Sequence, residues 1–159
     1  MRSSDRPPGI TRISIASDVS GALGFVAYGD PAHRYVVTRN ALLDTICTLF
    51  GGREAECLLY DDVSLGAGQD LERASAIARD LVERQGLAGK GSTLDGQVFA
   101  ADKPVSDNLR FHLEAATKEI LDQQRDRARK IVHEHRTQLE SLRDLLIERK
   151  VLDLSTHGR

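Results

Sequence analysis

Apolar and polar side chains alternate near the start of the chain, and this alternation predicts a β-hairpin. Isoleucine recurs through ITRISIAS at residues 10–17, and a second apolar run, LGFVAY, follows at residues 23–28. Two short extended runs joined by a polar turn are typical of a hairpin. RYVVT at residues 34–38 is a third extended piece, which either joins this hairpin or leads into a helix.

The spacing of apolar residues becomes helical after Thr38. Leucine, isoleucine and phenylalanine recur every three or four positions through residues 39–60, and Thr38 is suited to cap the first turn. Gly51 and Gly52 lie inside this helix, where each glycine costs on the order of 1 kcal/mol relative to alanine. A continuous helix therefore needs a closely packed neighbour at these two positions. A second helical face precedes Gly86, which is placed to end that helix, and consists of Leu71, Ala74, Ile77, Ala78, Leu81 and Val82.

The remainder of the chain has the pattern of a loop followed by two helices. Residues 87–105 are rich in glycine without a sustained period, with QVF as a candidate strand. Ser106 or Asp107 caps a long helix, and residues 136–150 supply a second helix that we expect to return antiparallel beside the first. The pattern predicts a mainly α fold, α+β in class, with a small N-terminal β-hairpin and a C-terminal antiparallel helix pair.

The expected organisation is a short arm followed by one domain. Residues 1–9 are polar and contain Pro-Pro-Gly, which is typical of a flexible arm. Residues 10–159 form the domain, and its parts are the hairpin region at 10–37, the central helices at 38–86, the loop at 87–105 and the helix pair at 106–150.

Composition narrows the classes of function. The 159 residues are 40% hydrophobic and 29% charged, which is ordinary for a globular domain. A net charge of −2 and an aromatic content of 4% without tryptophan argue against a nucleic-acid partner. No apolar run approaches the roughly 20 residues needed to cross a bilayer, so we expect no direct membrane contact and a cytoplasmic location. Cys47 and Cys57 lie in apolar stretches without CxxC spacing, and we expect both to be small buried side chains in a reducing compartment.

Several separated blocks of the chain carry a resemblance to one protein family and occur in that family's order. The central blocks are TRNALLD (38–44), GGREAE (51–56), VSLGAGQDLERA (63–74) and ARDLVERQG (78–86). Together they resemble the peptidase domain of FtsH-type proteases, the AAA-coupled zinc metalloendopeptidases. Residues 10–28 resemble the family's hairpin and residues 122–153 its closing helix pair, so the resemblance covers nearly the whole chain. It implies a helical metallopeptidase-like domain.

The resemblance implies a metal-binding role for Asp70. In the family the aspartate of the GAxxDL block coordinates zinc together with two histidines of an HExxH helix, and the matching residue here is Asp70. By the same resemblance Glu56, in GGREAE, is a partner of the zinc ligands near the zinc helix and not a ligand itself. The residues taken alone favour a simpler interpretation. An aspartate in the first turn of a helix interacts favourably with the helix dipole, by about 0.5–1 kcal/mol, and Glu56 is then a charged helix residue.

The sequence departs from the family at the zinc-binding helix. It contains no HExxH, and in HEHRT at residues 133–137 the two histidines are two positions apart, on diverging helix faces. Asp70 alone cannot hold a catalytic zinc, because such a site needs three protein ligands. We therefore expect no catalytic residue in this chain and no tight binding of zinc, the cofactor of the intact family. The helix is either cut off or lost, or another polypeptide supplies it.

Two functions from different classes are the main hypotheses. The first is the C-terminal portion of an ATP-dependent zinc metalloendopeptidase, a family that cleaves unfolded or membrane proteins delivered by a hexameric ATPase ring. We expect the isolated chain to be inactive, and it lacks the GxxxxGK[ST] motif of such an ATPase. The alternative is a non-catalytic, peptidase-like module for interaction or oligomerisation. A regulator acting through the charged helix at residues 118–136 ranks third, since only the charge pattern supports it.

The expected partners follow from the same resemblance. They are other copies of this chain or full-length AAA-coupled protease subunits, which form hexamers in the family, and polypeptide substrates in the intact enzyme. The family's membrane tether would lie far N-terminal of the region that this chain resembles.

Overall fold

The computed structural model of the protein forms two compact units and describes residues 9–16, 24–29, 37–89, 92–99 and 104–154. The sheet unit comes from both ends of the chain, Met1–Val36 and His135–Arg159, and the helical unit is Val37–Glu134. Most described residues are helical and one small sheet is antiparallel, so the predicted mainly α fold is confirmed. Among these residues, no helix is both long and apolar enough to span a membrane. The predicted arm at residues 1–9 lies outside the described residues except for Gly9.

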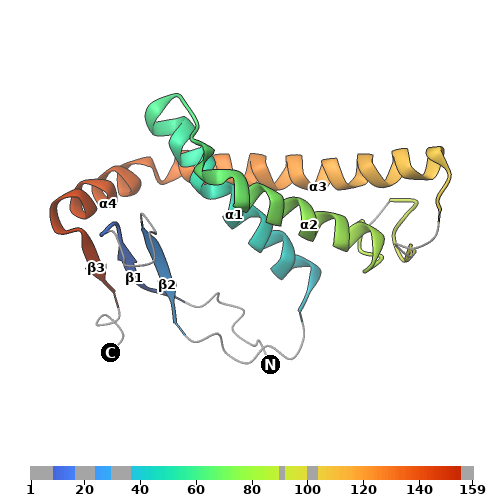
Figure 1. The fold of residues 1–159 in the computed structure, drawn as a ribbon, viewed down its shortest axis with the longest axis horizontal. Helices are drawn as coiled ribbons and strands as arrows, with labels where there is room; N and C mark the ends of the chain where they lie inside the picture. The colour runs from blue at the N-terminus through green and yellow to red at the C-terminus, as the bar shows by residue number, and fades with distance from the viewer. Residues whose placement is uncertain (1–8, 17–23, 30–36, 90–91, 100–103, 155–159) are drawn as a thin grey trace. The chain divides into compact units, whose positions relative to one another are not determined.

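The sheet unit holds a three-stranded antiparallel sheet in the order β2-β1-β3 (Figure 1). β1 (Ile10–Ser14) pairs with β2 (Phe25–Tyr28), which confirms the predicted hairpin. β3 (Val151–Asp153) pairs with the other edge of β1. In this register Ile13 stands between apolar residues of both neighbouring strands, so one face of the sheet carries an apolar row.

The third strand differs from the sequence prediction. RYVVT contributes no strand in its described residues, Val37 and Thr38, and residues 34–36 lie outside the description. The third strand instead follows α4 (Arg136–Arg149), where Lys150 takes a φ of 63° and turns the chain into β3. A strand of three residues is too short to show a recognisable alternation.

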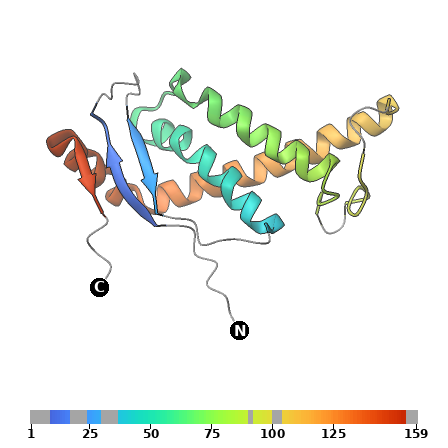
Figure 2. The same cartoon turned by 60° about the horizontal axis from the view of Figure 1, so that its bottom comes forward.

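The helical unit packs three helices around one apolar core (Figure 2). α1 (Arg39–Tyr60) begins where predicted, because the Thr38 hydroxyl accepts a backbone hydrogen bond from its first turn at 3.2 Å. α2 (Gly68–Glu83) follows a 3₁₀ turn, η1 (Leu65–Ala67), and α3 (Asp107–Glu134) packs against both α1 and α2. The three helices contribute the buried apolar side chains Ile46, Phe50, Ala74, Ala78, Leu81, Val82, Leu113, Ile120 and Ala128.

The end of α2 is formed as the sequence predicts. Gly86 has a φ of +61°, and the N–H of Leu87 donates to the carbonyl of Leu81 at 2.8 Å, which closes the helix end. In the loop beyond it Leu94 is buried in the core. The candidate strand QVF at residues 97–99 is not a strand, and the described loop residues form turns instead.

The expectation for Gly51 and Gly52 is wrong. α1 runs through both positions without interruption, but a Cβ atom built on either glycine would meet nothing within 4 Å. Neither glycine is therefore needed for the approach of another described part of the chain. The core side chains of α1 hold the helix together across this pair, since Phe50 and Glu54 flank it and are both buried.

The two C-terminal helices belong to different units. α3 lies in the helical unit, whereas α4 lies in the sheet unit and contacts β3 there. Neither unit therefore contains α3 and α4 as a packed pair. That residues 10–159 act together as one peptidase-like domain stays a prediction.

Candidate metal-ligand site

Asp70 lies in the first turn of α2 with an exposed side chain. The N-cap position of this helix is Ala67, which offers no side-chain hydrogen bond, so Asp70 is not the cap. Its carboxylate takes part in none of the side-chain hydrogen bonds or ion pairs found among the described residues. It lies in the first turn, near the positive end of the α2 helix dipole. Asp70 thus offers a carboxylate that has no hydrogen-bond or ion-pair partner among the described residues and could bind a metal ion.

The turn before α2 is fastened to α1 by Glu56. The backbone N–H of Ser64 donates to Glu56 Oε2 at 2.7 Å, and the Ser64 hydroxyl donates to Glu56 Oε1 at 2.8 Å. These two hydrogen bonds lower the pKa of Glu56, with the backbone N–H as the larger cause. The described partner of Glu56 is therefore the turn that precedes Asp70, which the sequence reasoning did not anticipate.

A small hollow lies at the same corner, between the end of α1 and the turn. Its volume is about 300 Å³, and Glu56, Tyr60, Asp62, Val63 and Ser64 line it. Tyr60 is 64% exposed, and Leu65, which follows Ser64 in sequence, is fully exposed. The corner therefore brings the carboxylates of Glu56 and Asp62 close to the exposed side chain of Tyr60.

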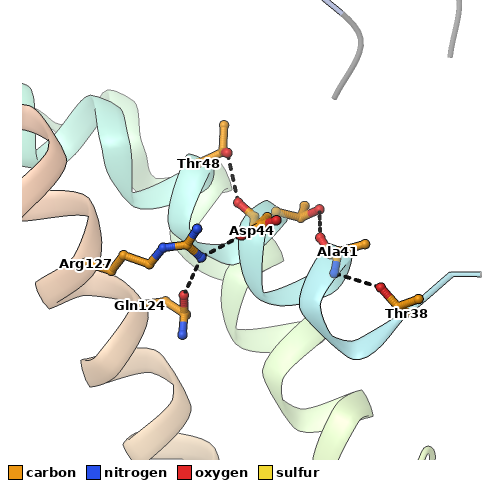
Figure 3. A network of polar contacts seen from close by, with 7 residues as sticks. Thr38, Ala41, Asp44, Thr48, Gln124 and Arg127 are labelled. Carbon is orange, nitrogen blue, oxygen red and sulfur yellow. Dashed lines mark hydrogen bonds and ion pairs between the residues drawn. The ribbon is translucent and has the colours of Figure 1, made fainter. Parts of the chain in front are cut away.

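Two ion pairs join α1 to α3. The Glu54 side chain is only 3% exposed, and its Oε1 lies 2.9 Å from Arg125 Nε. Figure 3 shows the second pair, in which Arg127 of α3 points to Asp44 of α1, with Nη1 and Oδ1 2.6 Å apart. A buried carboxylate needs such a partner, because an unpaired charge away from water is strongly unfavourable. The pairs fix α1, which carries Glu56, against α3.

The sequence reasoning missed these pairs because the alternating charges at residues 125–130 are typical of a solvated helix face. That interpretation fits Arg129, which pairs with Asp126 one turn away on the same helix. Arg125 and Arg127 instead reach a different helix. A pairing between residues 71 positions apart leaves no local signal in one sequence.

The cysteines differ in environment. Cys47 is buried, and burial raises the pKa of its thiol, as expected for a small core side chain. Cys57 is exposed, so the expectation that both thiols are buried is wrong for this residue. The reason is that α1 contributes no buried side chain after Glu54.

The described residues contain no group of three histidine, cysteine, aspartate or glutamate side chains that could hold a metal ion. His133 is near the end of α3, and His135 is in the break before α4 with a φ of −108°. His33 and His157 lie outside the described residues. Asp70 therefore stands as a single candidate ligand in the part of the chain that the structure covers.

Comparisons with known proteins show which family this chain belongs to. The sequence model of the family described as Peptidase family M41 matches residues 4–157. Relatives named ATP-dependent zinc metalloprotease FtsH are 33% identical in Pseudothermotoga lettingae over 91% of this chain and 35% identical in Rhodothermus marinus over 90%. The relative of the same name in Thermotoga maritima is 30% identical over 91% of the chain. The chain spans about a quarter of these relatives, 25%, 21% and 25% of their lengths respectively.

Proposed function

Because this chain belongs to Peptidase family M41, we propose that it is the C-terminal portion of an ATP-dependent zinc metalloendopeptidase and that Asp70 is one of the zinc ligands. The observation that carries the proposal is the state of Asp70. Its carboxylate is exposed, charged and uncommitted among the described residues, and it belongs to the block that resembles the family's metal-binding sequence.

A catalytic zinc takes three side-chain ligands and leaves one position for water. Asp70 fits the role of one ligand, because carboxylate oxygen binds zinc and nothing described competes for it. The other two ligands are the imidazoles of an HExxH helix, which the 159-residue sequence does not contain. We therefore infer that this chain by itself forms no complete zinc site and is catalytically silent.

Bound zinc would lower the pKa of a water molecule and so supply the nucleophile for peptide hydrolysis. The contribution of this chain is to hold a negatively charged oxygen at the metal. Glu56 is not a zinc ligand in this proposal. Its carboxylate holds the turn that leads to Asp70, because it accepts two hydrogen bonds from Ser64. The partners in this proposal are AAA-coupled subunits or further copies of the chain, and the substrates are polypeptides. We propose that the intact enzyme acts in the cytoplasm.

The proposal is tested by giving the chain the missing histidines. Residues 4–157 replace the matching segment of the Thermotoga maritima relative, and zinc per chain is measured by elemental analysis after dialysis. We expect about one zinc per grafted chain, by the ligand count of a catalytic site. Asp70→Asn should lose the zinc, whereas Glu72→Gln, which removes an exposed carboxylate one position beyond Leu71 on α2, should keep it.

Circular dichroism establishes that each grafted variant is folded. A folded graft whose Asp70→Asn variant retains zinc would refute the ligand role of Asp70. A folded graft that binds no zinc but associates with the relative's subunits would favour the alternative function, a non-catalytic interaction module.

A further inference from the structure

Ser64 is the point at which the turn between α1 and α2 is fastened. Its N–H and its hydroxyl donate to the two carboxylate oxygens of Glu56, at 2.7 and 2.8 Å. The same hydroxyl oxygen accepts a hydrogen bond from the backbone N–H of Gly66 at 3.2 Å. One side chain therefore connects α1 to the backbone that continues toward α2.

The chain runs from Ser64 to Asp70 without another side-chain anchor among the described residues. Ser64 is the extended residue that caps η1, with φ −85° and ψ 165°. Gly68 closes η1 and is also the first residue of α2, so the two helical segments are continuous. Ala67, at the N-cap of α2, adds no side-chain hydrogen bond. Ser64 is therefore the side-chain anchor nearest to the first turn of α2 among the described residues, while the rest of α2 is held by its packing in the core.

Metal ligands must be held close to their productive geometry, and the groups that orient them affect metal affinity strongly. We propose that Ser64 is a positioning residue for Asp70, and that the Glu56–Ser64–Gly66 hydrogen bonds aim the Asp70 carboxylate at the metal. This inference rests on the proposed function, because it requires Asp70 to be a ligand. Ser64 does not touch the metal or the substrate in this account.

The alternative role for Ser64 is purely structural, in which it stabilises the turn without affecting the metal. If Ser64 positions Asp70, Ser64→Ala weakens zinc binding even when the variant is as stable as the control variant Ser75→Ala. If its role is purely structural, zinc affinity does not change at that stability. Threonine keeps the hydroxyl that bonds to Glu56 and to the backbone, so Ser64→Thr should behave like the parent chain and shows whether the hydroxyl is the group responsible.

The first measurement uses the 159-residue chain itself and follows amide hydrogen exchange. In Ser64→Ala we expect the amides of residues 66–71 to exchange at least about tenfold faster, because the hydroxyl that joins Glu56 to the backbone of Gly66 is lost and only the backbone N–H of residue 64 still bonds to Glu56. Ser64→Thr should exchange at rates within about twofold of the parent chain. Ser75→Ala is the matched control, since the Ser75 hydroxyl donates to the carbonyl of Leu71 on the same helix at 2.8 Å, away from the turn. Unchanged exchange in Ser64→Ala would overturn the proposal.

The second measurement is the zinc dissociation constant of the grafted chain, determined by competition with a chelator. Ser64→Ala should weaken zinc binding by about tenfold or more, with Ser64→Thr restoring it and Ser75→Ala leaving it unchanged. If Asp70→Asn abolishes zinc binding but Ser64→Ala leaves it unchanged, the positioning role fails and the proposed function stands. If Asp70→Asn binds zinc normally, the proposed function itself fails. Equal losses in Ser64→Ala and Ser75→Ala would mean general weakening of α2 and would also overturn the positioning role.

Discussion

At the scale of single residues, Glu56 is a carboxylate that one neighbouring serine keeps in its charged form. Both of its oxygens accept hydrogen bonds from Ser64, so the charged form is favoured and the pKa is lowered. Arg53 lowers this pKa further, while Asp62 raises it. The contact therefore forms most fully when the carboxyl group is ionised.

This electrostatic arrangement gives a pH dependence with a definite sign. Because the pKa of Glu56 is lower in the folded chain than in the unfolded chain, its stabilising contribution is present above the unfolded pKa. The contribution is lost as the pH falls through the lowered folded value. Ser64→Ala removes the hydroxyl but keeps the backbone N–H, which is the larger cause, so the NMR titration midpoint of the Glu56 side-chain carbon should rise only part of the way toward the ordinary carboxyl value. The same midpoint in both chains would show that the Ser64 hydroxyl does not contribute to the lowered pKa.

Single residues differ in how well the sequence predicts their environment. Thr38 is predictable because its partner, the backbone of Ala41, is three residues away. Asp70 lies in the first turn of α2, as the local sequence pattern predicts, although the N-cap residue of this helix makes no side-chain hydrogen bond. The Glu56 contact spans a turn whose conformation the sequence does not specify. The exposure of Cys57 depends on where the core ends along α1, which is a property of packing and not of the helix pattern.

At the scale of secondary structure elements, α1 is the element that organises the candidate site. It packs against α3, and Asp44 and Glu54 join it to that helix through Arg127 and Arg125. Its C-terminal end presents Glu56 to the turn. Helical periodicity predicted α1, α2 and α3 because each has a long apolar stripe. β3 was missed because its three residues gain their strand conformation only by pairing with β1.

The glycines of the helical unit give a paired test of these elements. A Cβ atom at Gly52 has open space, so Gly52→Ala should raise the free energy of unfolding by about 0.5–1 kcal/mol through helix propensity. Gly86→Ala should lower it by about 1 kcal/mol or more. Gly86 has a φ of +61°, and its Cβ would lie 3.1 Å from the carbonyl oxygen of Gln97.

Urea unfolding followed by circular dichroism measures both glycine variants. A loss of stability in Gly52→Ala would show that a further part of the protein packs closely on α1 at that position. No change in Gly86→Ala would contradict the turn geometry at the end of α2.

At the scale of the whole molecule, the chain is a member of Peptidase family M41, and the proposal is that it carries one part of a composite zinc site. The match to Peptidase family M41 extends over residues 4–157, while the relatives are about four times as long. The separated sequence blocks predicted this family correctly, and the four central blocks lie in or next to α1, η1 and α2. The assignment of α4 to the sheet unit was not predictable, because amphipathic spacing alone does not identify the partner of a helix.

The central proposal is that one carboxylate cannot replace a complete set of zinc ligands and that this chain is therefore inactive by itself. The most direct test is elemental analysis of the purified 159-residue chain after dialysis against zinc, together with a casein digestion assay. The account predicts zinc far below one equivalent per chain and no digestion. About one tightly bound zinc per chain, or digestion that a chelator abolishes, would contradict it.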